Sequence, residues 1–127
     1  MKIAVIIART VMGLLFAMAS IVVLFNLAKE EPMEGAPKAF NEGLKAAVYF
    51  IPFLKVTELV CSIAFLTGRF VPLAAVVIFP IVLNILGYHT FVDHSPPGII
   101  TGLVLLTANL FLAYAYRKNY EGLLRAK

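Results

Sequence analysis

The sequence predicts an all-α membrane protein, a transmembrane four-helix bundle with both termini in the cytoplasm. Hydrophobic residues make up 61% of the 127-residue chain and charged residues only 14%, whereas a soluble domain carries about 25% charged residues. So small a soluble monomer could not cover its surface with so few polar side chains. Four continuous apolar stretches are each long enough for a bilayer core about 30 Å thick, which needs about 20 helical residues.

The first predicted span covers residues 3–28, and its start shares two features with a cleavable signal peptide. Lys2 gives a weakly basic start, and Ala17-Met18-Ala19 has the small-x-small form of a cleavage site. However, Arg9 interrupts the front of the run, and apolar residues continue beyond the would-be site. The stretch is therefore predicted to be an uncleaved membrane anchor.

An outward loop, residues 29–43, separates the first span from the second, which is predicted at 44–67. Glutamate, proline and glycine dominate the first half of the loop and indicate turns. After Pro37, a favourable first helical residue, Phe40 and Leu44 recur at helical spacing. A short interfacial helix leading into the second span is therefore expected.

The last two spans are predicted at residues 70–92 and 98–116. Only Gly68-Arg69 separates the second span from the third, which indicates a tight helical hairpin. Residues 93–97, with the sequence DHSPP, cannot be helical throughout, because proline lacks the backbone N–H that a helix interior needs. They are expected to form the loop between spans three and four.

The distribution of lysine and arginine predicts the orientation of the bundle. Six of these residues fall on the side of the two termini and three on the other side, which favours cytoplasmic termini. The net charge of +4 is then explained by lipid headgroups, with no nucleic-acid partner, and the expected location is a bacterial plasma membrane, the inner membrane of a Gram-negative cell. The six are Lys2, Arg69, Arg117, Lys118, Arg125 and Lys127, and the three are Lys29, Lys38 and Lys45.

Four polar side chains within the spans are predicted to form a cluster in the core of the bundle. They are Arg9, Lys55, Glu58 and Asn84. Arg9 and Glu58 fall at similar depths from the cytoplasmic end, so we expect a structural ion pair between the first two spans. Lys55 and Glu58 are three residues apart and share a helical face.

A ligand pocket is the second interpretation of these polar residues. Its candidates are Lys55, Glu58, Asn84, Tyr88 and His89. A lysine can donate to a quinone carbonyl, and a glutamate or histidine can relay a proton. The alternative is that the same groups only bond across helices and hold the bundle together. With one cysteine, Cys61, no intramolecular disulfide is expected, and neither a metal site nor a haem ligand pair is evident.

The order and spacing of these residues resemble the DoxX family of small four-span membrane proteins. The resemblance covers residues 8–118, and one departure is 60–62, where many relatives are glycine-rich. The motifs that carry it are Arg9 with Gly13, Lys55-x-x-Glu58 with the Gly68 turn, the Pro72-Leu73-Ala74 start of the third span, and Asn84 followed by His89.

The resemblance implies a membrane subunit, because the family takes its name from subunits linked to thiosulfate oxidation and quinone reduction. Other members resemble partners of redox enzymes or assembly factors for membrane proteins. Our first hypothesis is a non-catalytic subunit or accessory factor that stabilises a larger membrane complex, or that self-associates. The alternative is a quinone-interacting component of a thiosulfate:quinone oxidoreductase-like enzyme. The chain carries no evident redox centre, so it is not expected to be catalytic alone. A transporter is disfavoured because the spans show no repeat.

Overall fold

The computed structural model describes residues 2–27 and 34–123, and every regular element in these ranges is helical. Four of the helical segments are long and apolar enough to cross a membrane. The predicted fold class, an all-α protein with four membrane spans, is therefore confirmed. The elements are α1 (Lys2–Leu24), α2 (Ala36–Ala46), α3 (Phe50–Thr67), α4 (Val71–Gly87), a π-helical turn η1 (Tyr88–Val92), α5 (Pro96–Ala115) and a 3₁₀ turn η2 (Arg117–Tyr120).

The second span differs from the expectation at its start. A continuous helix from residue 44 was expected, but α2 ends at Ala46, and the backbone of Ala47 leaves the helical region with ψ of 88°. The span itself begins at Phe50. Residues 36–46 thus form a separate amphipathic helix. The first span ends at Leu24, and residue 28, its expected end, lies outside the described residues.

The turns follow directly from local sequence. Gly68 adopts the left-handed conformation with φ of 76° and donates its N–H to the Ala64 carbonyl at 3.0 Å, which ends α3. Glycine takes this conformation without steric cost. At the start of α5, the Ser95 hydroxyl accepts the Gly98 N–H at 3.4 Å, and two prolines occupy the first helical positions. Both are typical helix-start signals.

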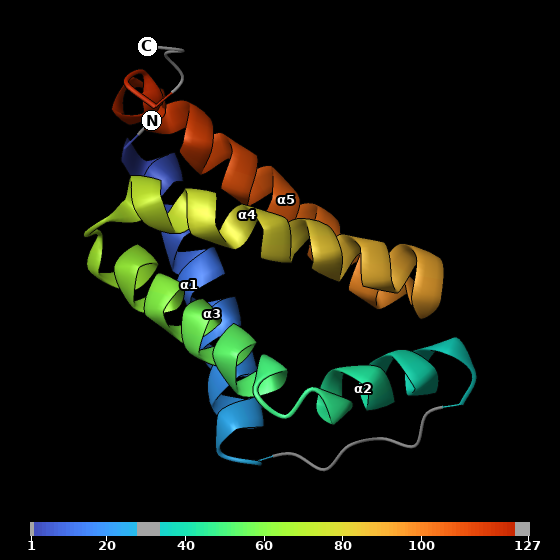
Figure 1. Ribbon diagram of the computed structural model, residues 1–127. Helices are drawn as coiled ribbons and strands as arrows, with labels where there is room; N and C mark the ends of the chain where they lie inside the picture. Colours follow the sequence, from blue (N-terminus) through green and yellow to red (C-terminus); the bar gives the residue numbers. More distant parts are fainter. Residues whose placement is uncertain (1, 28–33, 124–127) are drawn as a thin grey trace.

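The four spans form two antiparallel pairs, α1 with α3 and α4 with α5 (Figure 1). The two pairs meet at the end that holds both termini and the Gly68 turn, which we call the terminus end. They diverge toward the opposite end, where α2 lies across the opening and contacts α3 and η1. We call this opposite end the α2 end.

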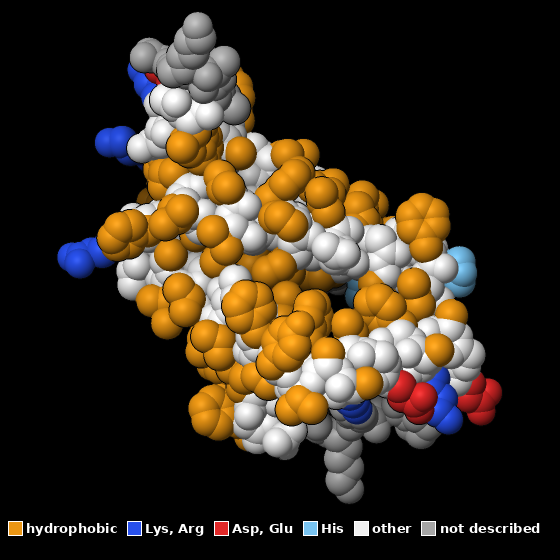
Figure 2. Space-filling model, viewed as in Figure 1, with side chains coloured by type: hydrophobic (Ala, Val, Ile, Leu, Met, Phe, Trp, Pro, Cys, Tyr) orange, Lys and Arg blue, Asp and Glu red, His pale blue; other side chains and the backbone are white. Residues whose placement is uncertain are grey.

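The core lies toward the terminus end. In α3 the buried residues run from Glu58 to Phe65, and in α4 from Val71 to Val82. Both ranges are the parts of the helices near their shared turn. Large apolar side chains are exposed over the outside of the bundle (Figure 2). Such a surface is what lipid solvates, so the protein is an integral membrane protein.

Candidate functional site

Lys55 and Glu58 form an ion pair on α3, near the point where the two helix pairs begin to diverge. The Lys55 ammonium lies 3.2 Å from Glu58 Oε2. The Lys55 side chain is 18% exposed and the Glu58 side chain 3% exposed. Glu58 is the most deeply buried charged residue of the described chain. A buried carboxylate needs a partner close by, and here that partner lies one turn away on the same helix.

The packing of α1 against α3 sets the surroundings of this pair. A Cβ added at Gly13 would lie 2.6 Å from Leu66 Cγ and 3.3 Å from the Ser62 carbonyl, so α1 approaches α3 closely there. The two helices are antiparallel, so residues earlier in α3 face residues later in α1. Glu58 therefore falls beside the turn of α1 that ends at Ser20, a fully buried residue.

The expected ion pair between Arg9 and Glu58 is not formed. The Arg9 guanidinium lies against Gly68, ten residues beyond Glu58 and about 15 Å further along a helix. The close approach at Gly13 agrees with this register: Gly13 lies beside Ser62 and Leu66, so in an antiparallel pair Arg9, four residues earlier in α1, lies beside the end of α3. Glu58 is neutralised by Lys55 instead.

Asn84 does not belong to a polar core cluster, contrary to the expectation. Its side chain is exposed, and Nδ2 donates to the Pro80 carbonyl at 2.8 Å within the same helix. Short polar side chains often satisfy themselves on the carbonyl one turn earlier. This bond lets an amide face the outside of a span without a partner on another helix.

Tyr88 and His89 lie at the α2 end, where Tyr88 contacts α2. Its ring centroid is 5.0 Å from that of Phe40, and its hydroxyl accepts a hydrogen bond from Asn41 Nδ2 at 3.1 Å. The rings of Tyr88 and His89 meet edge to face with centroids 5.1 Å apart. Tyr88 therefore links α2 to the end of the third span.

His89 faces the start of α5. Its Nδ1 lies 3.4 Å from Asp93 Oδ2, one helical turn later, and the ring packs on Gly98, where any Cβ would clash with it. The π-helical turn makes this placement, since the Asp93 N–H bonds to the Tyr88 carbonyl five residues back. Such turns are frequent at functional sites.

Asn109, eleven residues after the start of the predicted fourth span, is a buried polar residue outside the candidate pocket. Its Nδ2 donates across the bundle to the Ala75 carbonyl at 3.1 Å, while Oδ1 is buried without a hydrogen-bond partner. A long-range backbone partner of this kind has no sequence signal. The bond joins α5 to α4 and is typical of polar contacts between membrane helices.

The five candidate pocket residues thus fall into separate places. Lys55 is joined to Glu58, Tyr88 is joined to His89, and Asn84 bonds only within α4; among the described residues, no hydrogen bond or ion pair links one group to another. The polar contacts of the described residues therefore place these side chains in three separate groups. In residues 2–27 and 34–123, no group of three histidine, cysteine or carboxylate side chains could hold a metal ion.

These features define a class of protein: a small α-helical integral membrane protein with four spans. Within that class, residues 4–92 match the DoxX family model, which is more than half of the chain. The chain therefore belongs to the DoxX family, as the resemblance of its motifs indicates. The match runs from the first turn of α1 to the end of η1. No curated protein and no solved structure matched the chain.

Proposed function

We propose that this DoxX family protein is a non-catalytic subunit or accessory factor that stabilises a larger complex in the bacterial plasma membrane. The observation that carries the proposal is the self-contained ion pair of Lys55 and Glu58. Each charge has an opposite charge within one helix, which supports a structural role that requires no ligand. Ionisable side chains inside membrane helices pair with one another, which lowers the cost of burying each charge.

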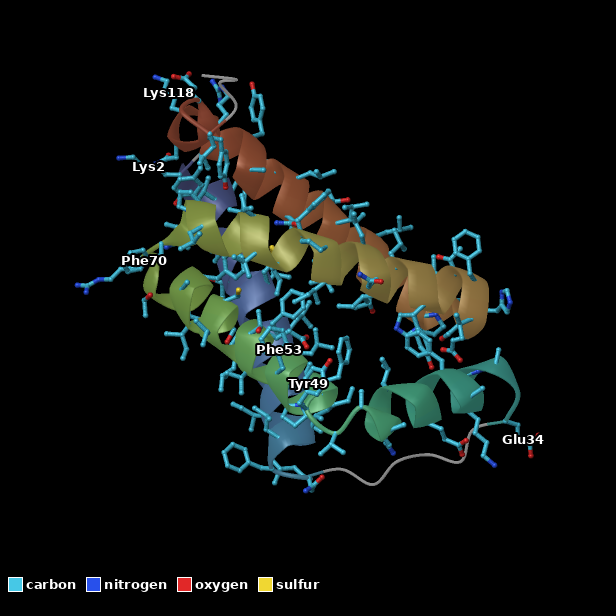
Figure 3. All side chains as sticks on the ribbon, in the orientation of Figure 1. Lys2, Glu34, Tyr49, Phe53, Phe70 and Lys118 are labelled. Carbon is cyan, nitrogen blue, oxygen red and sulfur yellow. The ribbon has the colours of Figure 1, made fainter. Side chains whose placement is uncertain are left out.

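The α2 end supports a role in association. No residue of α2 is buried. Between α2 and the first turn of α3, three large side chains are 67–86% exposed: Val48, Tyr49 and Phe53. Two of them, Tyr49 and Phe53, are labelled in Figure 3. An amphipathic helix and exposed aromatic residues at one end of a bundle suit contact with lipid headgroups or with a second membrane subunit.

A quinone-interacting component is the second candidate function, and one observation favours it. The Lys55 side chain keeps 18% of its exposure, so one donor of the buried pair remains reachable. A quinone carbonyl would accept from that ammonium, with Glu58 as the adjacent carboxylate. Under this alternative Lys55 and Glu58 serve the ligand directly, whereas Tyr88 and His89 serve only to hold α2 and α5.

Native mass spectrometry distinguishes the two candidates. The protein is extracted with its surrounding lipid by a copolymer that forms nanodiscs, and the matched control is the same extraction from cells that lack the chain. The proposal predicts that the chain is recovered with other subunits in a fixed ratio and without stoichiometric quinone. Recovery of the chain alone with one quinone per chain would contradict it and favour the second candidate.

A further inference from the structure

A crevice of about 380 Å³ opens at the terminus end, between the first turns of α1 and the last residues of α5. Its walls contain three apolar and three polar residues. Val5, Ile6 and Ala115 supply the apolar part, and Lys2, Arg9 and Tyr116 supply the polar part. No candidate residue of the Lys55–Glu58 or Tyr88–His89 regions lines it.

Arg9 is one of the polar residues that line this crevice, and its charge has no counter-charge among the described residues. Its Nε is buried without a hydrogen-bond partner, and within the described ranges the guanidinium makes neither a hydrogen bond nor an ion pair. A guanidinium inside a membrane span is costly unless it is paired. The arrangement therefore leaves a partly buried cation, without a hydrogen-bond or ion-pair partner among the described residues, in the wall of the crevice.

The carboxyl end of α3 partly stabilises the charge of Arg9, because the guanidinium lies against Gly68, which caps that helix. The negative end of a helix dipole favours a cation there. However, none of the last carbonyls of α3 accepts a hydrogen bond from Arg9 in the structure. The dipole therefore explains why the guanidinium lies at this position, but it gives the guanidinium N–H groups no hydrogen-bond acceptor.

The other groups around the crevice attract an anion as well. Lys2 adds a second positive charge, and the Tyr116 hydroxyl, which makes no hydrogen bond within the described residues, adds a free donor. Arg117 and Lys118 follow at the end of α5, and Figure 2 shows basic side chains gathered at this end. Figure 3 labels Lys2 and Lys118 there. Among the described residues of this end, Glu121 is the single carboxylate.

We propose that this crevice binds a phosphate group, held by the Arg9 guanidinium in its two-donor geometry with Lys2 and Tyr116 as further donors. Guanidinium is well suited to phosphate because two parallel N–H groups match two phosphate oxygens. The phosphate is carried either by an anionic lipid headgroup or by a soluble phosphate ester. Arg9 lies seven residues after Lys2, about 10 Å along α1, a depth from which its side chain reaches the headgroup layer.

The apolar wall of the crevice favours a lipid as the source of the phosphate. Val5 and Ile6 border the same crevice as the basic groups, so the first methylenes of an acyl chain would pack on them while the phosphate meets Arg9. Basic pockets between membrane helices bind anionic headgroups in this manner. A soluble ester would use the polar part alone.

The test measures thermal protection of delipidated protein in uncharged detergent. Three probes are added at equal concentrations: dioctanoyl phosphatidylglycerol, dioctanoyl phosphatidylcholine and inorganic phosphate. Arg9→Gln removes both the charge and the two-donor geometry of the guanidinium, and Arg9→Lys keeps the charge alone. Lys118→Gln is the control outside the crevice. We expect phosphatidylglycerol to protect wild type and Lys118→Gln alike, and Arg9→Gln to weaken its affinity at least tenfold, with Arg9→Lys in between.

Lys2→Gln keeps the proposal testable if Arg9→Gln does not fold, because Lys2 is exposed at the helix start. It should weaken the same binding by a smaller factor. Protection by phosphatidylglycerol alone identifies a lipid as the phosphate source, and equal protection by inorganic phosphate identifies a soluble source. Equal protection by phosphatidylglycerol and phosphatidylcholine without any effect of phosphate, or unchanged binding in the folded Arg9 and Lys2 variants, would overturn the proposal.

Discussion

The two ends of the bundle differ in how tightly their helices pack, although both consist of similarly apolar sequence. At the terminus end, α1, α3, α4 and α5 pack together, and small residues such as Gly13 allow close contact between helices. At the α2 end, the first two turns of α3 and the π-helical turn contain no buried residue. Hydrophobicity alone therefore does not decide where a membrane bundle packs, since lipid solvates apolar side chains as well as a protein core does.

The polar groups divide in the same way. The Lys55–Glu58 pair lies at the border between the two ends, Arg9 lies in the packed end, and Tyr88 and His89 lie in the open end. Among the described residues, α2 is the element that lies across the open end, and this contrast suits the proposed role in association. The variants below separate the two ends, beginning with the largest expected effect.

Chemical labelling should separate the two ends completely. In a Cys61→Ala background, a cysteine at Glu34 is expected to react with an impermeant maleimide in intact cells, because the positive-inside rule predicts that the α2 end faces outward. A cysteine at Lys118 should react only after the membrane is opened. Figure 3 shows these two positions at opposite ends. Labelling of the Lys118 position alone would reverse the orientation.

Glu58→Gln should destabilise the bundle strongly. It leaves the Lys55 ammonium without its counter-charge in a largely buried position, at a cost of about 3 kcal/mol. The control is Glu42→Gln on exposed α2, which should change stability little. Both variants are compared by thermal unfolding in the same detergent. Equal midpoints for the two would show that the pair does not support the fold.

A matched pair of glycine variants tests the packing contrast itself. Gly13→Ala would place a Cβ 2.6 Å from Leu66 Cγ, whereas a Cβ at Gly87 meets nothing within 4 Å. We expect the first to cost about 2 kcal/mol through overpacking. The second should be neutral or stabilising by up to about 1 kcal/mol through helix propensity. If the two variants unfold at the same denaturant concentration, the close approach of α1 and α3 is not essential.

Tyr120 gives a smaller and pH-dependent contribution at the terminus end. Its hydroxyl donates to the Pro72 carbonyl at 2.6 Å, and Tyr120→Phe should cost about 1 kcal/mol. Burial, with a smaller effect of Tyr116, raises the pKa of Tyr120 above its ordinary value of 10.0. The bond is therefore fully present below pH 10 and is lost as the pH rises through the higher folded-state pKa. Unfolding measured from pH 8 to 12 should show this decline in wild type and not in Tyr120→Phe.

The four spans and the Gly68 turn were predictable because they depend on hydropathy and on one residue's backbone freedom. The partner of Arg9 was not, because the register of α1 on α3 depends on how Gly13 meets Leu66 in space. The exposure of Asn84 was equally hidden, since a membrane helix is apolar on both its lipid and its core faces. The contact of His89 with Asp93 was not predicted either, because Asp93 was expected in a loop and the π-helical turn brings it to His89.

The double variant Lys55→Met/Glu58→Gln tests most directly the central claim that the buried pair is structural. It removes both charges together, so neither is left unpaired, and it keeps the side-chain volumes close to the original. The measurement is quinone-linked turnover per assembled complex in native membranes, with the amount of complex measured in parallel. We predict that turnover per complex is unchanged and that any loss of activity follows the loss of complex in proportion. Full assembly with abolished quinone reduction would contradict the account and assign the pair to a quinone site.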